Sequence, residues 1–270
     1  LIEVCAREFG HTPQYAIFDT AFHRHIPKEL GSYALPEYLV KKYNLKRVGF
    51  HGISHRYIME ESCKFLGRDP GTQKIISCHL GSGGSSVCAI RNGKSINSSM
   101  GFTPLEGLMM NTRCGDLDIG VLFHVMAKNN FSPEEAEKVL NYKSGILGVF
   151  SSSSDMRDVA KKSQDDEKAK IAFDMYVRRV RKYIGYNSLL LKKANILVFT
   201  DTLGIEMPVL RQSICKGLEC LGIKLDTAKN NAAISGDADL TAPGSEVKVL
   251  AIPTNEEIMI AREAYEASRE

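Results

Sequence analysis

The order of hydrophobic and polar positions along the chain predicts both strands and helices. Short apolar runs bounded by glycine or by polar residues are typical of buried strands. Such runs occur at residues 15–20, 74–80, 85–90, 94–99, 195–200 and 246–254. The first of them ends in Asp19, and an acid at the carboxyl end of a strand is well placed to face a cleft.

Turn residues between these runs predict how three of the strands connect. Asn92-Gly93 separates the runs at 85–90 and 94–99, and this dipeptide is typical of a type I′ β-hairpin. The runs at 74–80 and 85–90 are joined by the glycine-rich segment GSGG. Three consecutive strands are therefore expected here.

Longer segments predict helices between and after these strands. Ser132 is followed by proline and then by Glu135, a capping-box pattern that starts a helix. Further helices are predicted at about 1–10, 166–192 and 208–221, and from Asn255 onward. Strands, a hairpin and crossover helices together predict an α/β fold with a mixed sheet.

Composition and charge narrow the class of protein. The 270 residues are 43% hydrophobic and 25% charged, which is typical of a globular protein. A net charge of +3, with basic residues scattered, does not predict nucleic-acid binding. Seven cysteines without a CxxC pair favour a reducing, cytoplasmic location. No apolar run predicts a membrane span, and the start at Leu1 indicates a piece of something longer.

The segment 101–118, GFTPLEGLMMNTRCGDLD, has neither helical nor strand periodicity. Its three glycines predict a loop shaped by backbone freedom, which is typical of a binding loop. Arg113 offers a planar, permanently charged group suited to carboxylate or phosphate. Asp116 and Asp118 are predicted to orient Arg113 or to serve a hard metal ion. The alternative is a surface turn with a solvated arginine.

Two further motifs carry candidate chemistry. HLGSGGSS at 79–86 predicts a turn whose backbone N–H groups can approach phosphate, the alternative being an ordinary hairpin. His51 and His55, four residues apart, are predicted to share a helix face. The zinc-protease pattern HExxH needs a glutamate where the chain has Gly52, so metal ligation is not expected there. His51 is a candidate to donate a hydrogen bond to a phosphoryl group, the alternative being a packed structural histidine.

These features together supply what a phosphoryl transfer needs. Asp19 offers an acid for Mg²⁺, His51 and Arg113 offer cationic donors, and the segment 79–86 offers a phosphate cradle. No general base stands out, which is expected if the acceptor is already an anion.

At this point six segments resemble the acetate kinase family and occur in its order. They are AIFDTAFH at 16–23, GFHGISHRY at 49–57, CHLGSGGSS at 78–86, GFTPLEGLMMNTRCGDLD at 101–118, SSSDMRD at 152–158 and IPTNEE at 252–257. The GFTPLEGLMM segment distinguishes acetate and propionate kinases from butyrate kinases. The resemblance spans nearly the whole chain and implies an actin-like (ribonuclease H-like) ATPase domain with a mixed sheet.

The resemblance also implies roles for individual residues. Asp19 matches the aspartate near Mg²⁺ and the transferring phosphoryl group, and Glu256 matches the glutamate that supports the metal. His51 and Arg113 match the pair that stabilises this group in flight. The residues implied to bind phosphate or nucleotide are His79, Gly81, Ser82, Gly83, Asp155, Met156, Arg157, Thr202, Leu203 and Gly204. The acetate methyl group is implied to lie against Phe50 and Pro104.

The chain departs from the family pattern in three places. Ser82 stands where the family usually has asparagine. The family's AGIGEN is here Asp201 to Glu206, and Thr202 in place of glycine is expected to narrow the base pocket or restrict φ. The family's first strand, phosphate turn, arginine and HGG motif are absent. We therefore expect a remnant of an N-terminal acyl-substrate domain at 1–21, a nucleotide-binding domain at 22–257, and a helix returning to the first domain at 258–270.

The expected activity is reversible phosphoryl transfer from ATP to acetate, with Mg²⁺ as cofactor and a homodimer as the assembly that the resemblance implies. Three alternatives stay open. The acceptor can be propionate, because one methylene gives only about 1–3 kcal/mol of discrimination. The donor can be pyrophosphate, because the loop at Thr202 is altered. Finally, the chain alone can be a non-catalytic nucleotide-binding fragment, because half of the usual cleft is absent.

Overall fold

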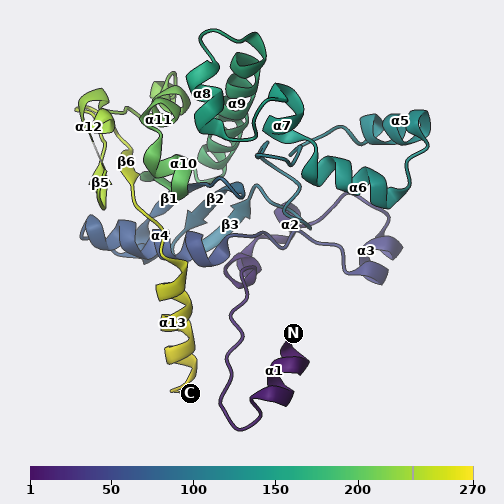
Figure 1. The fold of residues 1–270 in the computed structure, drawn as a ribbon. Helices are drawn as coiled ribbons and strands as arrows, with labels where there is room; N and C mark the ends of the chain where they lie inside the picture. Colours follow the sequence, from purple (N-terminus) through teal and green to yellow (C-terminus); the bar gives the residue numbers. More distant parts are fainter. Residues whose placement is uncertain (233, 270) are drawn as a thin grey trace.

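The computed structural model describes residues 1–232 and 234–269. Its strands form a single six-stranded sheet in the order β3-β2-β1-β4-β6-β5 (Figure 1). They are β1 (Lys74–Leu80), β2 (Ser85–Arg91), β3 (Lys94–Ser98), β4 (Ile196–Thr200), β5 (Ala238–Asp239) and β6 (Lys248–Ala251).

The sheet is mixed, as the sequence predicts. Strands β1, β4 and β6 run parallel to one another, while β2, β3 and β5 run antiparallel to their neighbours. Asn92 and Gly93 at the β2–β3 turn both have positive φ, at 52° and 76°. This is the backbone of a type I′ turn, which confirms the predicted hairpin.

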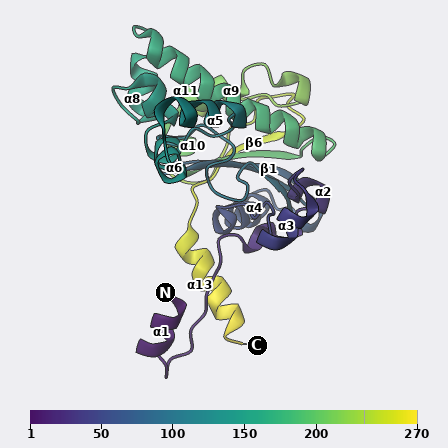
Figure 2. The ribbon, with the colours of Figure 1, turned by 90° about the vertical axis from the view of Figure 1, so that its right-hand side faces the viewer.

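Helices cover both faces of the sheet and extend beyond its edge. One face carries α7 (Gly145–Phe150), α8 (Met156–Lys162), α9 (Glu167–Leu190), α10 (Asp201–Glu206) and α11 (Pro208–Cys215), and the other carries α4 (Gly52–Phe65) (Figures 1 and 2). The remaining helices are α1 (Ile2–Glu8), α2 (Lys28–Gly31), α3 (Glu37–Tyr43), α5 (Ile119–Asn129), α6 (Pro133–Tyr142), α12 (Thr227–Asn231) and α13 (Glu256–Ala267). Short 3₁₀ helices occur at Ala21–His25, Pro70–Thr72 and Glu219–Leu221. In both views α1 and α13 project from the same side of the body.

Side chains of β1 alternate between two hydrophobic clusters. Ile76, Cys78 and Leu80 belong to the larger cluster beneath α7–α11, whereas Ile75 belongs to a smaller cluster beneath α4. By the same alternation, the polar residues Ser77 and His79 lie on the α4 face. The α4 face of the sheet is therefore apolar at one end and polar at the other, where the parallel strands end.

The strand predicted at 15–20 is wrong. These residues form no strand, and Tyr15 and Phe18 are 43% and 57% exposed. A strand needs a neighbour to pair with its backbone groups, and this segment pairs with no strand of the described residues. An apolar run in the sequence does not show whether such a neighbour exists.

Other predicted elements differ mainly in length. The capping box at Ser132 and Glu135 is present and starts α6. The helix predicted at 208–221 ends at Cys215, because Gly217 adopts a left-handed φ of 80°. Helices α2, α3, α5, α7, α8, α10 and α12 and the two-residue strand β5 were not predicted. All seven cysteines are free thiols. Among the described residues, every helix is too short or too polar to span a lipid bilayer.

Candidate active site

A cleft of about 500 Å³ lies at the carboxyl ends of the parallel strands. His79 lies near the end of β1, Asp201 follows β4, and Glu256 comes after β6. This edge of an open α/β sheet is where ligands usually bind. The cleft is lined by His51, His79, Gly83, Gly84, Asp201, Thr254, Asn255, Glu256 and Glu257.

Asp19 is brought to this region by the start of α4. Its Oδ2 accepts a hydrogen bond from the His51 amide at 2.7 Å, and its Oδ1 accepts one from the Ile53 amide at 3.3 Å. The Asp19 carbonyl accepts a third from Gly52 at 3.0 Å. An acid at a helix N-terminus satisfies donors that lack helical partners. Asp19 thus lies beside His51 in a loop, not at the end of a strand, and is not among the residues that line the cleft.

His51 precedes α4 in a left-handed conformation, with φ of 56°. It therefore does not share the face of α4 with His55 as predicted, although the two ring centroids are 6.5 Å apart. The His51 ring stacks on His79 at 4.1 Å between centroids. Its Nδ1 shares a hydrogen bond with Ser86 Oγ at 2.9 Å, so its Nε2 is left to face the cleft.

Serine hydroxyls connect the histidines into one buried cluster. Nε2 of His55 lies 2.9 Å from Ser86 Oγ, and Nδ1 of His55 lies 2.9 Å from Ser77 Oγ. His79 Nδ1 lies 2.8 Å from Ser54 Oγ. Burial, followed by repulsion from neighbouring histidines, holds the pKa of His55 well below its usual value. The pKa of His51 is lowered for the same reasons, with Arg113 adding to the effect.

These lowered pKa values predict a loss of stability in acid. Since the unfolded chain protonates His55 near pH 6.5 and the folded chain does not, stability is complete above that pH and falls as the pH is lowered through it. Each such histidine lowers the free energy of unfolding by about 1.4 kcal/mol for every pH unit below 6.5. Urea unfolding at pH 7.5 and 5.5 measures this loss. His55→Asn should reduce the loss of unfolding free energy between these two pH values, while His124→Asn, at an exposed position, should not. An equal loss in both variants would contradict the prediction.

A further buried histidine, His23, was missed by sequence reasoning. Its Nδ1 lies 2.8 Å from Ser95 Oγ and its Nε2 lies 2.9 Å from the Phe50 carbonyl. His23 thus supports the backbone directly before His51. Its partner Ser95 is 72 residues away, and no local pattern signals such a contact.

Arg113 and His51 both lie close to Gly84, which lines the cleft. A Cβ added to Gly84 would lie 3.3 Å from Arg113 Nη1 and 3.4 Å from His51 Nε2. Within the described part of the chain, Arg113 makes no ion pair; its Nη1 contacts Met110 Sδ at 3.5 Å. A guanidinium and a histidine nitrogen, both able to donate to an anion, therefore approach the same glycine.

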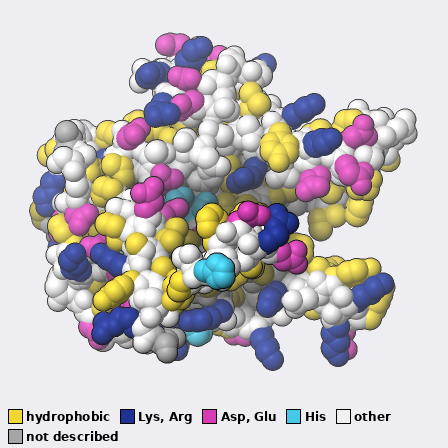
Figure 3. Space-filling model, turned by 60° about the horizontal axis from the view of Figure 1, so that its bottom comes forward, with side chains coloured by type: hydrophobic (Ala, Val, Ile, Leu, Met, Phe, Trp, Pro, Cys, Tyr) yellow, Lys and Arg dark blue, Asp and Glu magenta, His cyan; other side chains and the backbone are white. Residues whose placement is uncertain are grey.

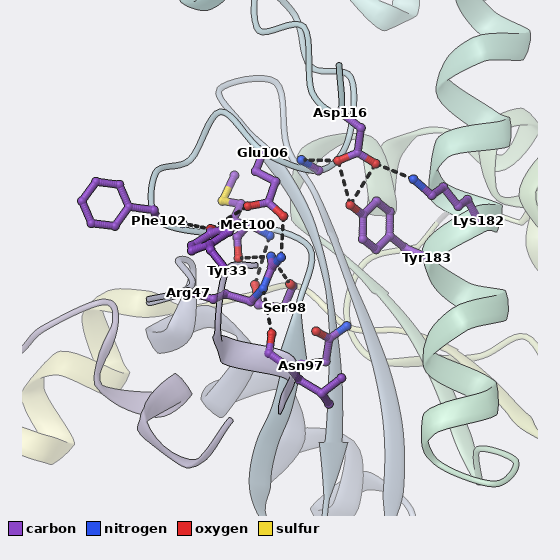
Figure 4. Close-up of polar contacts among 12 residues, drawn as sticks. Tyr33, Arg47, Asn97, Ser98, Met100, Phe102, Glu106, Asp116, Lys182 and Tyr183 are labelled. Atoms are coloured by element: carbon purple, nitrogen blue, oxygen red, sulfur yellow. Dashed lines mark hydrogen bonds and ion pairs between the residues drawn. The ribbon is translucent and has the colours of Figure 1, made fainter. Parts of the chain in front are cut away.

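The segment 101–118 is an irregular loop, as predicted, and two polar networks hold it (Figure 4). In the first, Glu106 pairs with Arg47 and accepts a hydrogen bond from Tyr33 Oη at 2.8 Å. Arg47 also donates to the carbonyls of Ser98 and Met100 at 3.2 Å. This network ties the loop to the edge of the sheet.

Asp116 anchors the second half of the loop, not Arg113. It accepts hydrogen bonds from the Gly107 amide at 3.0 Å, from Lys182 at 2.6 Å and from Tyr183 at 2.9 Å (Figure 4). Asp118 caps α5 through the Gly120 amide. The prediction that these two acids orient Arg113 is therefore wrong, because their hydrogen bonds go to other groups. Their service to a metal ion stays a prediction.

The glycine turn after β1 and the start of α10 lie against each other. The Ser82 amide donates a hydrogen bond to Thr202 Oγ1 at 3.0 Å. Asp201 Oδ2 lies 3.1 Å from His79 Nε2. The backbone of Thr202 is not left-handed, so the expected restriction of φ does not arise. Sequence reasoning singled out Thr202 here but gave Asp201 no role.

The acids of the cleft fit a metal ion only together with a ligand. Among the described residues, no three His, Cys, Asp or Glu side chains gather closely enough to hold one alone. Burial, followed by repulsion from Asp19 and Asp201, raises the pKa of Glu256 against the opposing effect of His79. Mg²⁺ typically takes one or two carboxylates plus substrate phosphates. Asp19 and Glu256 fit that donor set.

Other residues singled out from the sequence lie outside the cleft lining. Met156 is buried at the start of α8, and Asp155 caps that helix while pairing with Arg157. Arg157 also reaches Glu206, at the end of α10, at 3.1 Å. Phe50 and Pro104 are both half-buried, Phe50 directly before His51 and Pro104 in the loop 101–118. Leu203 and Gly204 are buried within α10.

Comparison with proteins of known sequence and structure gives a consistent result. The chain is 47% identical to an acetate kinase of Dictyoglomus turgidum over 263 residues, which cover 97% of the chain and 64% of the relative. It is similar to the crystal structure of Porphyromonas gingivalis acetate kinase, with a TM-score of 0.93, 37% identity, and coverage of 98% and 66%. A propionate kinase from Francisella tularensis gives a TM-score of 0.89, 36% identity, and coverage of 97% and 66%.

The chain thus spans about two thirds of the length of the relatives it matches. Within that length the agreement is continuous, since the sequence pattern of the acetokinase family matches residues 1–262. The motifs around Asp19, His51, the glycine turn and Arg113 all fall inside the matched range. On this match, the chain belongs to the acetokinase family.

Proposed function

We propose that the chain is the catalytic, nucleotide-binding part of an acetate kinase, which transfers a phosphoryl group from ATP to acetate and forms acetyl phosphate and ADP. The observation that carries this proposal is the convergence of His51 and Arg113 on Gly84, with Asp19 bonded to the His51 amide. A phosphoryl group in transit spreads negative charge over its oxygens, and fixed donors stabilise that charge.

In this mechanism the protein positions the reactants and neutralises charge. Arg113 and His51 Nε2 bind oxygens of the transferring group, while the glycine turn 81–84 and His79 hold the donor's phosphates. Asp19 and Glu256 would hold Mg²⁺, which supplies positive charge to the phosphates when bound. Acetate is ionised at neutral pH, so the acceptor oxygen attacks without a general base.

The remaining predicted contacts complete the proposal. Asp155, Met156 and Arg157 would hold the nucleoside, together with Thr202, Leu203 and Gly204. Since Met156 is buried, its contact with a nucleoside requires movement of the start of α8. Phe50 and Pro104 would contact the methyl group of acetate. We also propose the division at 1–21, 22–257 and 258–270, a homodimer, and a cytoplasmic location, the last supported by seven free thiols.

Two other reactions of the same class are favoured by particular observations. The similarity to the Francisella tularensis propionate kinase supports propionate as an acceptor. The contact of Thr202 with the glycine turn supports a different donor, such as pyrophosphate. Assays that replace acetate or ATP by these compounds separate the three reactions.

A non-catalytic nucleotide-binding fragment is the second candidate function. The chain covers about two thirds of its relatives, and hydrophobic side chains are exposed on the face from which α1 and α13 project (Figure 3). Those on α1 and α13 include Ile2, Val4, Ile258, Ile260 and Tyr265. Exposed apolar surface of this kind usually marks an interaction site, and an open cleft admits water.

Acetyl phosphate formation from ATP and acetate in the presence of Mg²⁺ tests both candidates. We expect ATP binding but little turnover by the 270-residue chain, and turnover by a fusion that supplies the N-terminal part of the Dictyoglomus turgidum acetate kinase. Robust turnover by the chain alone would reject the fragment hypothesis. An inactive, folded fusion, next to an active enzyme from the relative, would reject the proposed activity.

A further inference from the structure

The carboxylate of Asp201 lies directly against the glycine turn. A Cβ added to Gly81 would be only 2.0 Å from Asp201 Oδ2, so the acid fills the space beside the Gly81 backbone. The same oxygen lies 3.1 Å from His79 Nε2, and Oδ1 accepts a hydrogen bond from the Thr202 amide at 2.7 Å. These two contacts, together with the close approach to Gly81, define the position of a side chain that also lines the cleft.

The backbone of Asp201 is left-handed, with φ of 63°. Glycine, asparagine and aspartate adopt this conformation most readily among the amino acids. The conformation directs the start of α10 back toward β1 and its turn. An aspartate at this position is therefore compatible with the fold, and an asparagine would be equally compatible.

Thr202 adds a second contact to the same turn. Its Oγ1 accepts the hydrogen bond of the Ser82 amide at 3.0 Å. The Gly81 amide is also used, since it donates to the Gly84 carbonyl at 3.0 Å. Backbone donors that a phosphate would need are thus partly satisfied within the protein, and the adjacent side chain is negatively charged.

The charge on Asp201 persists at neutral pH. Burial acts to raise the pKa of this carboxyl, but its hydrogen bonds to His79 and Thr202 outweigh burial, so the pKa lies below its usual value. The nearby acid Glu256 adds to the negative charge of the cleft. A phosphate entering the turn therefore meets an anion of the protein itself.

We propose that Asp201, assisted by Thr202, occupies the phosphate-binding turn as an internal anion and weakens binding of the phosphoryl donor. The inference rests on the proposed function, because it takes the turn 81–84 to be the donor's phosphate site. Asp201 is in this sense a residue that sets donor affinity. Two like charges a few ångströms apart change affinity by about tenfold or more in a partly buried site.

Asp201→Asn is the sharpest test, since it keeps the size and the left-handed backbone and retains one oxygen to accept from the Thr202 amide, while it removes the charge. Calorimetric titration with ATP, and separately with pyrophosphate, both with Mg²⁺, is expected to give dissociation constants lower than those of the unmodified chain by about tenfold or more. Thr202→Val, which frees the Ser82 amide, should lower them by a smaller factor. Asp174→Asn is the charge-matched control, because Asp174 is an exposed acid on α9 outside the cleft lining.

The outcomes are distinct. Tighter binding by Asp201→Asn, with less than about a threefold change in Asp174→Asn, supports the inference. Equal or weaker binding by a folded Asp201→Asn variant overturns it and leaves the proposed function standing. Equal gains in both variants would show a general charge effect and also overturn it. If neither the unmodified chain nor any variant binds ATP or pyrophosphate at millimolar concentration, the proposed phosphate site fails, and this inference fails with it.

Discussion

Alanine at position 113 is expected to lower the turnover number of phosphoryl transfer by about 10²–10³-fold, because it removes a preorganised cation from the transferring group. Arg113 is not used in any ion pair of the described residues, so its charge is available to a ligand. Arg113 and His51 both approach Gly84, so two donors lie close to the glycine turn. The measurement is acetyl phosphate formation by the fusion protein described above.

Two controls separate catalysis from structure in this experiment. Arg68→Ala removes an exposed arginine that only contacts Gln73, and it should leave turnover unchanged. Arg113→Lys keeps the charge without the planar fork and should recover part of the rate. Thermal unfolding of Arg113→Ala should resemble that of the unmodified protein. Near-normal turnover in a folded Arg113→Ala variant would remove Arg113 from the mechanism.

Replacing Glu106 with glutamine should lower the free energy of unfolding by about 3 kcal/mol. Glu106 is the ion-pair partner of Arg47, and the two side chains are only 32% and 17% exposed. Removal of the acid leaves a largely buried guanidinium without a counterion. The figure is at the low end for buried pairs because Glu106 retains some solvent contact. Chemical denaturation compared with the unmodified chain gives the difference directly.

The matched control is Glu37→Gln on α3. Glu37 also pairs with a cation, Lys41, but both side chains are more than 70% exposed. That substitution should have little effect on unfolding, because exposed pairs contribute little. If Glu106→Gln unfolds at the same denaturant concentration as Glu37→Gln, the Arg47–Glu106 pair does not hold the loop. The Glu106→Gln substitution should also lower the turnover number, because the loop that Glu106 holds carries Arg113.

Local signals in the sequence predicted local structure well. Asn92 and Gly93 readily adopt the positive φ values that a type I′ turn requires. Ser132 and Glu135 form a capping box within four consecutive residues. The order of the strands in the sheet, and the absence of a strand at 15–20, could not be predicted from local signals. Whether an apolar run becomes a strand depends on a neighbour elsewhere in the chain, and Tyr15 and Phe18 have none in the sheet.

The same limit explains what was missed in the candidate site. Arg113 and His51 were identified through their motifs, and their roles stay predictions until tested. Asp116 was misread because Lys182 and Tyr183, its partners, are more than 60 residues away. Asp201 stood inside a recognised segment, but its contact with His79 depends on β1 and β4 being neighbours. Contacts across the sheet are not encoded in any short window.

The hydroxyl of Ser86 restricts the tautomers of the two histidines that it joins. It carries one proton, so it can donate to only one of the nitrogens His51 Nδ1 and His55 Nε2 while it accepts from the other. For neutral rings, only two consistent proton arrangements follow, and they differ at every position from Ser77 to the cleft. A bound phosphate oxygen requires the arrangement with a proton on His51 Nε2. Anion binding at the surface of the cleft would therefore fix the direction of every hydrogen bond in this buried row, down to the middle of β1.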